Sequence, residues 1–307
     1  MQPRRIAVII PCYNEELTIV KVVKDCKSTI PNAVIYVINN NSTDNSAELA
    51  EKAGATVYNC TYQGKGNVIR YAFTKIDADI YIIADGDDQC DMKVIPDALK
   101  KFISEDLDML NLIRVADSQS SYRYGHAWGN KILTGLANFL FQNKCSDILG
   151  GYRLFSKRYA KSFPGHSKGF EIEIELSIFA YQMRLPTSEI QIPYRARPIG
   201  SVSKLHTIKD GIRILLTIIY LFTNEKPITF FGGIASIFGI LGLYWIIDIW
   251  IEFLKISAVP RFPTLIFAVT FLLLSLLLLT TGLMIHYIQR NTFEQRRYAY
   301  LNVEEKN

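Results

Sequence analysis

Short, continuous apolar runs alternate with amphipathic stretches over the first third of the chain. Residues 6–10, 34–38 and 80–84 form such runs, and a shorter extended segment is expected at 56–59. Uninterrupted runs of this length are typical of strands buried on both faces of a parallel sheet. Strands that alternate with helices predict an α/β fold whose doubly wound sheet is mostly parallel.

Three helices are expected between these strands. The first would be capped by Asn14 and would carry acidic residues in its first turn. Its apolar face would be formed by Ile19, Val22, Val23 and Cys26. The second would cover residues 44–53 and end at Gly54, and the third would cover residues 65–75.

Two long apolar stretches follow the part of the chain that carries nearly all the charge. Residues 228–247 and 262–288 contain no Asp, Glu, Lys or Arg. Each stretch reaches the ~20 apolar residues that a bilayer core requires. We therefore predict a transmembrane helical hairpin at 227–289, with a short connecting loop at 248–261. Two buried core helices are the alternative, but core helices seldom stay uncharged over such a length.

The segment just before the first apolar stretch has an amphipathic pattern. The apolar residues that share one helical face are Ile208, Ile212, Leu215, Leu216 and Ile219. We interpret the segment as a helix that lies in the membrane interface, with a core helix as the alternative. The predicted organisation is a first domain at 1–206, an interfacial helix at 207–226, the hairpin at 227–289 and a tail at 290–307.

Composition and charge narrow the partners and the compartment. The chain has 34 Lys+Arg and 29 Asp+Glu, and it has no block of like charge and no aromatic–basic interleaving, so we expect no nucleic-acid binding. Five scattered cysteines fit a reducing compartment. The N-terminus lacks a signal-peptide pattern, and the tail carries several arginines. We expect a multi-pass protein of the plasma (inner) membrane, with the first domain and the C-terminus in the cytoplasm.

Polar clusters directly follow three of the predicted strands, at residues 11–15, 39–44 and 85–91. Doubly wound sheets bind ligands beyond the carboxyl ends of their strands. Asp85 and Asp87 are well placed to hold Mg²⁺ or Mn²⁺, because such a cation takes one or two protein carboxylates and completes its shell with diphosphate oxygens and water. A polar turn that caps the next helix is the alternative for this triplet alone.

Two further segments are candidates for phosphate contacts. The Gly-rich segment 63–67 opens a helix with backbone N–H groups, but it lacks the spacing of a Walker or dinucleotide motif, and an ordinary loop is its alternative. The basic segment 195–204 contains Arg197 and Lys204, whose cations suit phosphate. A basic stretch that contacts only anionic lipid is the alternative for this second segment.

Taken in order, these motifs resemble the family 2 glycosyltransferases. The matching segments are Pro11-Cys12-Tyr13-Asn14-Glu15, Asn40-Asn41-Ser42-Thr43-Asp44, Asp85-Gly86-Asp87 and Gly151-Tyr152-Arg153. With the terminal helix pair, the arrangement is similar to the polyprenyl-phosphate group, which includes dolichyl-phosphate mannose synthase and bactoprenol glucosyltransferase. The resemblance implies a Rossmann-like glycosyltransferase-A fold and a nucleotide-sugar-binding domain at 1–206.

The resemblance also implies roles for individual residues. Those expected to bind the nucleotide sugar are Pro11, Tyr13, Glu15, Asn40, Asp44, Lys65 and Asp85. Those expected to hold Mg²⁺ or Mn²⁺ are Asp85, Asp87 and Gln89. The catalytic set is Asp85, Asp87, Arg114, Arg197 and Lys204, with Arg114 expected at the acceptor phosphate and the last two over the diphosphate. Candidate supporting acids are Asp147, Glu171 and Glu173.

Two positions depart from the family pattern. Asn39 and Asn40 replace the usual paired acids, which affects the contacts to the nucleotide base. Gly150 replaces a common Ser ahead of the Gly-aromatic-Arg triplet.

The expected reaction is an inverting transfer of a sugar from a nucleoside diphosphate sugar to polyprenyl phosphate at the cytoplasmic membrane face. A UDP-sugar such as UDP-glucose is favoured, and GDP-mannose is the second choice. A processive polysaccharide synthase is an alternative, although its Q-x-x-R-W motif is absent. A nucleotidyltransferase would need a Gly-rich signature after the first strand, where this chain has Pro-Cys-Tyr-Asn-Glu. The non-enzyme alternative is a membrane scaffold or a flippase, neither of which would need a sugar donor. The expected partners are the donor, the lipid acceptor and membrane lipids, and a homo-oligomer is left open.

Overall fold

The computed structural model describes residues 4–116, 124–142, 145–194, 198 and 207–303. The chain forms two compact units. The first contains Met1–Leu216 together with Arg296–Asn307, and the second contains Thr217–Gln295. Each unit is described by itself below.

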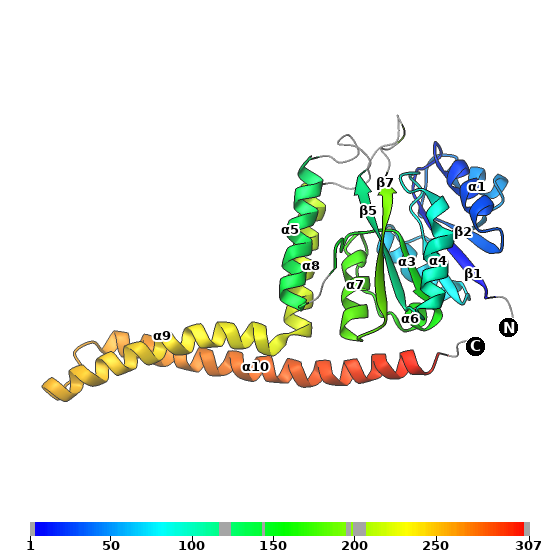
Figure 1. Ribbon diagram of the computed structural model, residues 1–307. Helices are drawn as coiled ribbons and strands as arrows, with labels where there is room; N and C mark the ends of the chain where they lie inside the picture. Colours follow the sequence, from blue (N-terminus) through cyan, green and yellow to red (C-terminus); the bar gives the residue numbers. More distant parts are fainter. Residues whose placement is uncertain (1–3, 117–123, 143–144, 195–197, 199–206, 304–307) are drawn as a thin grey trace. The chain divides into compact units, whose positions relative to one another are not determined.

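A seven-stranded sheet forms the centre of the first unit, with the strand order β3-β2-β1-β4-β6-β5-β7 (Figure 1). The strands are β1 Ile6–Cys12, β2 Ala33–Asn39, β3 Thr56–Asn59, β4 Ile80–Ile83, β5 Met109–Ala116, β6 Arg153–Ser156 and β7 Thr187–Tyr194. All pairs are parallel except those of β6, which runs antiparallel to both β4 and β5. The predicted mostly parallel α/β fold is therefore confirmed.

Helices lie on both faces of this sheet (Figure 1). The helices of the first unit are α1 Ile19–Thr29, α2 Ser46–Lys52, α3 Lys65–Lys75, η1 Met92–Val94, α4 Ile95–Ser104, α5 Tyr124–Phe141, α6 Lys157–Ser162 and α7 Ile172–Gln182. Helix α8, Thr207–Glu225, runs from the first unit into the second. The last helix occupies the segment for which we predicted an interfacial helix. Its place at a membrane surface stays a prediction.

Each face of the sheet is covered by its own apolar layer. On one face, side chains of β1 and β4 such as Ile10 and Ile82 form a cluster with α1 and α4. On the other face, Tyr81 of β4 contacts Phe73 of α3 edge-on, with ring centroids 5.6 Å apart. Successive strand residues point to opposite faces, so a strand covered on both faces must be apolar at every position. This explains the continuous apolar runs of the sequence.

The first helix begins later than the sequence predicted. Helix α1 starts at Ile19, and the expected N-cap Asn14 has a φ of 53°. The Asn14 side chain accepts a hydrogen bond from the backbone N–H of Thr43 at 2.8 Å, so it joins two loops instead of capping a helix. The expected apolar face of the helix is confirmed, since its four predicted residues are all buried.

The second unit contains the last residues of α8, from Thr217 on, and two long helices. Helix α9 covers Pro227–Ile256, and α10 begins at Phe262 and runs to Leu301, its last residues belonging to the first unit. Both are long and apolar enough to cross a membrane, and their most apolar windows are only 11% and 6% buried, which argues against core helices. Gly242 allows close packing, since a Cβ there would lie 2.9 Å from Leu272 of the neighbouring helix.

The predicted loop between the two helices is shorter than expected. Helix α9 continues past Asp248 to Ile256, so nine residues that we assigned to the loop are helical. Arg261 donates to Asp248 at 2.8 Å and to Glu252 at 2.7 Å. These ion pairs join the start of α10 to the last turns of α9, which explains why charged residues there do not end the helix.

Candidate active site

The polar loops named from the sequence meet at one edge of the sheet. Parallel strands β1, β2, β4 and β5 end at this edge, and antiparallel β6 begins there. The Tyr152 hydroxyl donates to the Asp85 carbonyl at 3.2 Å, which ties the start of β6 to the end of β4. A Cβ on Gly86 would lie 3.5 Å from the Pro11 carbonyl, so the loops after β1 and β4 are in contact. The topology therefore brings segments far apart in sequence into one site.

The loop after β4 is held in place by the protein. The Thr18 hydroxyl donates to the Gly86 carbonyl at 2.6 Å. The Asp87 carboxylate is 7% exposed and accepts from the Gln89 backbone N–H at 3.3 Å. The conformation of the loop that follows Asp85 is thus fixed.

The oxygen ligands in this loop fit a hard divalent cation. Asp85, Asp87 and Gln89 offer two carboxylates and one amide oxygen, the ligand types that Mg²⁺ and Mn²⁺ prefer. Among the described residues there is no group of three or more His, Cys, Asp or Glu side chains placed to hold a metal. The loop therefore suits a cation that completes its coordination with substrate oxygens and water.

Lys65 lies between two carboxylates and is almost fully buried. Its Nζ donates to Asp85 Oδ1 and to Glu173 Oε1, both at 2.7 Å. Burial alone would lower the pKa of this amine, but attraction to the two carboxylates outweighs burial and raises the pKa. Burial raises the pKa of the Glu173 carboxyl, although Lys65 opposes the shift. The site thus contains a cation of its own beside the first aspartate of the motif.

Gly151 lies directly against this cluster. A Cβ at this position would lie 2.7 Å from Lys65 Nζ and would also collide with the Asp85 carboxylate. The glycine of the Gly-aromatic-Arg triplet thus lets the backbone approach the charged pair closely. The arginine of the same triplet has a structural place, since Arg153 is 1% exposed and donates to the carbonyls of Ile148 and Gly150, both at 2.8 Å.

Asn40 and Asp44 direct their side chains to neighbouring backbone. Asn40 donates to the carbonyls of Cys60 and Tyr62 and accepts from the Gly64 N–H at 2.6 Å. It thereby fixes the Gly-rich segment from which Lys65 extends. The Gly66 N–H donates to the Lys168 carbonyl at 2.9 Å, so this segment also uses its donors within the protein.

Asp44 organises the loops that follow β1 and β2. Its carboxylate accepts from the Ser46 N–H at 3.0 Å and from the Glu16 N–H at 3.2 Å. Partial burial would raise the pKa of this carboxyl, but these hydrogen bonds outweigh it and lower the pKa. The Glu15 N–H donates to the Ser46 hydroxyl at 2.7 Å, which also joins these two loops. Tyr13, in the loop after β1, is 38% exposed to solvent.

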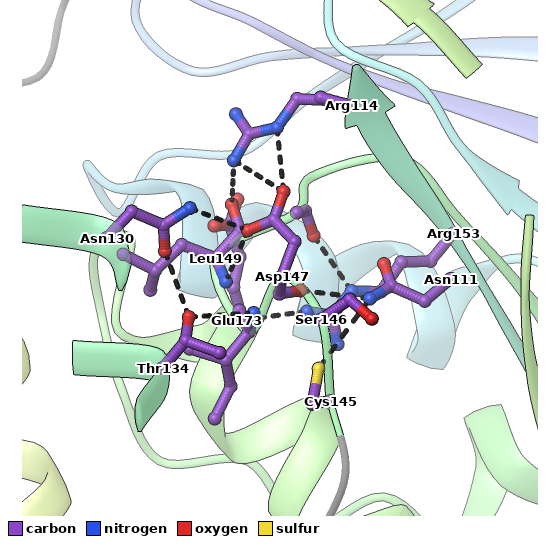
Figure 2. Close-up of polar contacts among 12 residues, drawn as sticks. Asn111, Arg114, Asn130, Thr134, Cys145, Ser146, Asp147, Leu149, Arg153 and Glu173 are labelled. Atoms are coloured by element: carbon purple, nitrogen blue, oxygen red, sulfur yellow. Dashed lines mark hydrogen bonds and ion pairs between the residues drawn. The ribbon is translucent and has the colours of Figure 1, made fainter. Parts of the chain in front are cut away.

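Asp147 is the centre of a hydrogen-bonded cluster beside strand β5 (Figure 2). It is 4% exposed and accepts from Arg114 through Nε at 3.0 Å and a terminal nitrogen at 2.9 Å. Asn130 of α5 donates to its other oxygen at 2.9 Å. Arg114 also donates to the Leu149 carbonyl at 3.1 Å. The guanidinium is thus held near the end of β5, and its contact with an acceptor phosphate stays a prediction.

Two of the predicted site residues cannot be placed in this geometry. Arg197 and Lys204 lie outside the described residues. Asn130 was not identified from the sequence, because an asparagine on an amphipathic helix carries no signal until the fold brings Asp147 beside it.

The arrangement of this edge agrees with a comparison to known families. A family model described as glycosyl transferase family 2 matches residues 7–163. The chain belongs to this family. The family resemblance read from the motifs is confirmed, and the chain is a glycosyltransferase.

Relatives of the chain within this family cover most of its length. Glycosyltransferase AglJ of Haloferax volcanii is 32% identical over 78% of this chain and 80% of its own length. The undecaprenyl-phosphate 4-deoxy-4-formamido-L-arabinose transferase of Serratia proteamaculans is 24% identical over 94% of this chain and 89% of its own length. The polyprenyl-phosphate group is thus represented among the relatives.

The fold has close counterparts among solved structures. Glucosyl-3-phosphoglycerate synthase of Mycobacterium tuberculosis, solved with Mn²⁺, UDP-glucose and phosphoglyceric acid, superposes with a TM-score of 0.60. It is 20% identical and covers 71% of this chain and 80% of its own. This likeness supports the glycosyltransferase-A fold of the family.

Proposed function

We propose that this glycosyltransferase moves a sugar from a nucleoside diphosphate sugar to the phosphate of a polyprenyl carrier, with inversion at the anomeric carbon. The observation that supports the proposal is that an acidic site and a basic residue lie at the same edge of the sheet. The carboxylates of Asp85 and Asp87 suit a cation with a diphosphate, and Arg114 suits a second phosphate. A donor diphosphate and an acceptor phosphate are the two anions that such a reaction must bring together.

The acceptor phosphate needs little activation by the protein. It is already anionic near neutral pH, so positioning and charge control contribute more than a general base. Asp147 accepts hydrogen bonds from Arg114, Asn130 and the Leu149 N–H, and in this role it fixes the arginine. A divalent cation, when bound, would neutralise the leaving diphosphate. No protein nucleophile is required for a single displacement.

The donor is proposed to be a UDP-sugar, with UDP-glucose as the first candidate. The Mycobacterium structure with the same fold was solved with UDP-glucose and Mn²⁺, which supports trying this pair first. GDP-mannose remains the second candidate. The side-chain amide of Asn40 is bonded to the Gly-rich segment, so we place its role in shaping the donor pocket through Lys65.

The lipid acceptor is proposed from the second unit and from one relative. Two helices long and apolar enough to cross a membrane follow the catalytic unit, and a relative is named for undecaprenyl phosphate. Helix α8 exposes apolar side chains ahead of them, with Ile212 and Leu216 at 54% and 59% exposure. We propose that it lies in the interface on the cytoplasmic side, where a carrier lipid presents its phosphate.

A donor and acceptor screen tests the proposal directly. Purified full-length protein in detergent is given Mn²⁺, short-chain polyprenyl phosphate and either UDP-glucose, other UDP-sugars or GDP-mannose. The expected result is a glycolipid whose formation requires lipid, metal and one donor. Release of nucleoside diphosphate without lipid product, or no turnover with any donor, would contradict the proposal. A product that grows by several sugars would favour a processive synthase.

A further inference from the structure

Glu173, a candidate supporting acid from the sequence, is linked to Asp85 of the proposed metal motif through the Lys65 ammonium. It lies on α7, is 6% exposed, and its Oε1 accepts from Lys65 Nζ at 2.7 Å. The same Nζ donates to Asp85 Oδ1 at 2.7 Å. A carboxylate 108 residues away in sequence from Lys65 thus completes a carboxylate–ammonium–carboxylate chain that ends on the first aspartate of the motif.

We infer that Glu173 is a positioning residue of the donor site, which holds Lys65 so that Asp85 stays available for a cation–diphosphate pair. This inference rests on the proposed use of Asp85 and Asp87. Glu173 does not touch the reacting groups, and its effect passes through the lysine.

The surroundings of Lys65 leave its side chain little alternative. The side chain is 9% exposed, and its Nζ lies 5.9 Å from the centroid of the Phe170 ring. The next residue, Gly66, packs against the backbone of Ser167 so closely that a Cβ would collide with its carbonyl. The start of α3 and the loop before α7 therefore enclose the lysine from two sides.

The charge count explains why a second carboxylate is needed. With Asp85 alone, Lys65 would form a one-to-one pair and would compete with a metal ion for that carboxylate. Because Glu173 also binds the ammonium, Asp85 does not have to neutralise it alone. The carboxylates of Asp85, Asp87 and Glu173 together with the Lys65 ammonium then give a net formal charge of minus two. A site with this net charge complements a divalent cation, whereas loss of Glu173 would halve the net charge.

A metal-binding measurement separates this role from a purely structural one. The affinity for Mn²⁺ is measured by electron paramagnetic resonance with and without UDP, in the full-length protein and in Glu173→Gln. We expect a loss of about tenfold in Mn²⁺ affinity, as for one unit charge removed a few ångströms away. Unchanged Mn²⁺ affinity in Glu173→Gln would overturn the inference.

Glu175→Gln is the matched control on the same helix. The Glu175 carboxylate accepts from the His166 N–H at 2.8 Å and from the Ser167 hydroxyl at 2.6 Å, so it holds a loop and does not contact Lys65. We expect this control to lower the melting temperature while leaving Mn²⁺ affinity within about twofold, since it bonds neutral donors. An equal loss of affinity in both variants would overturn the inference.

Glu173→Asp keeps the measurement decisive if the glutamine variant does not fold. It retains the charge but shortens the side chain, so we expect an intermediate Mn²⁺ affinity and a higher KM for the donor with kcat less affected. Failure of the glycosyl-transfer assay in the parent protein, with the Glu173 effect on Mn²⁺ intact, would reject the proposed reaction alone. Transfer that proceeds while Mn²⁺ affinity ignores Glu173 would reject this inference alone.

Discussion

The Arg114 guanidinium and the Asp147 carboxylate form a two-point ion pair, with Nε at 3.0 Å and a terminal nitrogen at 2.9 Å from the same Oδ2 atom. Arg114 comes from the end of β5 and Asp147 from the loop before β6. The pair fixes the plane of the guanidinium, which matters for a group proposed to meet a phosphate.

Replacement of Asp147 by Asn should therefore impair acceptor use more than donor use. An amide at this position cannot match the charge of Arg114, so the guanidinium should lose its fixed orientation. We expect the KM for polyprenyl phosphate to rise by roughly tenfold, in line with one misplaced positioning contact. Steady-state kinetics against each substrate, with UDP binding by calorimetry, measures the difference.

Ser146→Ala is the control for this loop. The Ser146 hydroxyl donates to Glu189 at 2.6 Å, away from Arg114, so its loss should leave both KM values nearly unchanged. If Asp147→Asn alters donor and acceptor binding to the same degree, the pair does not serve the acceptor.

Asp87→Asn should nearly abolish transfer. The residue is 7% exposed in the loop proposed to hold the cation, and its replacement removes one of two carboxylates there. We expect kcat/KM to fall by at least ~100-fold, with a melting temperature close to that of the parent protein. Product formation over a Mn²⁺ titration checks the prediction.

The neighbouring Asp88→Asn provides the matched comparison. Asp88 pairs with Lys21 of α1 at 2.5 Å and has a φ of 57°, which asparagine also tolerates. Activity within about threefold of the parent is expected, because an exposed ion pair contributes little. Equal losses from both substitutions would show that the loop, and not a metal carboxylate, is what matters.

The lowered pKa of Asp44 implies that part of the folding stability is lost in acid. Hydrogen bonds from Ser46 and Glu16 hold the pKa of this carboxyl below its ordinary value in the folded state. A carboxyl with a lowered folded pKa stabilises the protein above its unfolded pKa, and that stability is lost as the pH falls through the folded pKa. Asp44→Asn should thus be less stable than the parent at neutral pH, and the gap should close below about pH 4.

Melting temperatures of both proteins between pH 3 and 7 test this dependence. A constant difference between Asp44→Asn and the parent at every pH would mean that lost packing, and not lost charge, explains the destabilisation.

Much of the fold follows from local patterns in the sequence. Strands β1 and β4 are continuous apolar runs because both of their faces are covered, and helix α3 covers the predicted residues. Strand β6 is different: it has four residues and begins with buried Arg153, whose charge the sequence cannot reconcile with a central strand. Two carbonyls of the preceding loop, at Ile148 and Gly150, and the Ser177 hydroxyl of α7 accept hydrogen bonds from this guanidinium.

In the candidate site, too, only the residues marked by a local sequence pattern could be predicted. The order of motifs revealed Asp85, Asp87 and the loops that follow the strands, because these residues are adjacent in sequence. The Glu173–Lys65 contact joins residues 108 positions apart, and no local pattern indicates it. Asn14 was assigned the wrong role for a related reason, since its hydrogen bond to Thr43 outweighs its capping preference.

The last turns of α10 make a contact within the first unit that should stabilise it. Asp108 is fully buried and accepts from the Tyr300 hydroxyl at 2.7 Å and from Arg158 Nε at 2.7 Å. The guanidinium of Arg158 also lies 5.2 Å from the centroid of the Tyr300 ring. Tyr300→Phe retains the ring but removes a hydrogen bond to a buried carboxylate, which should cost about 1.5–3 kcal/mol in the free energy of unfolding.

Tyr298→Phe is the control, because Tyr298 is 66% exposed two residues earlier in the same helix. Denaturant unfolding of the first unit, followed by circular dichroism in detergent, should show a lower midpoint for Tyr300→Phe and an unchanged midpoint for the control. Limited proteolysis should likewise cleave the tail sooner in Tyr300→Phe. Identical midpoints and cleavage rates for the two variants would mean that residues 296–301 do not bind Asp108 in solution.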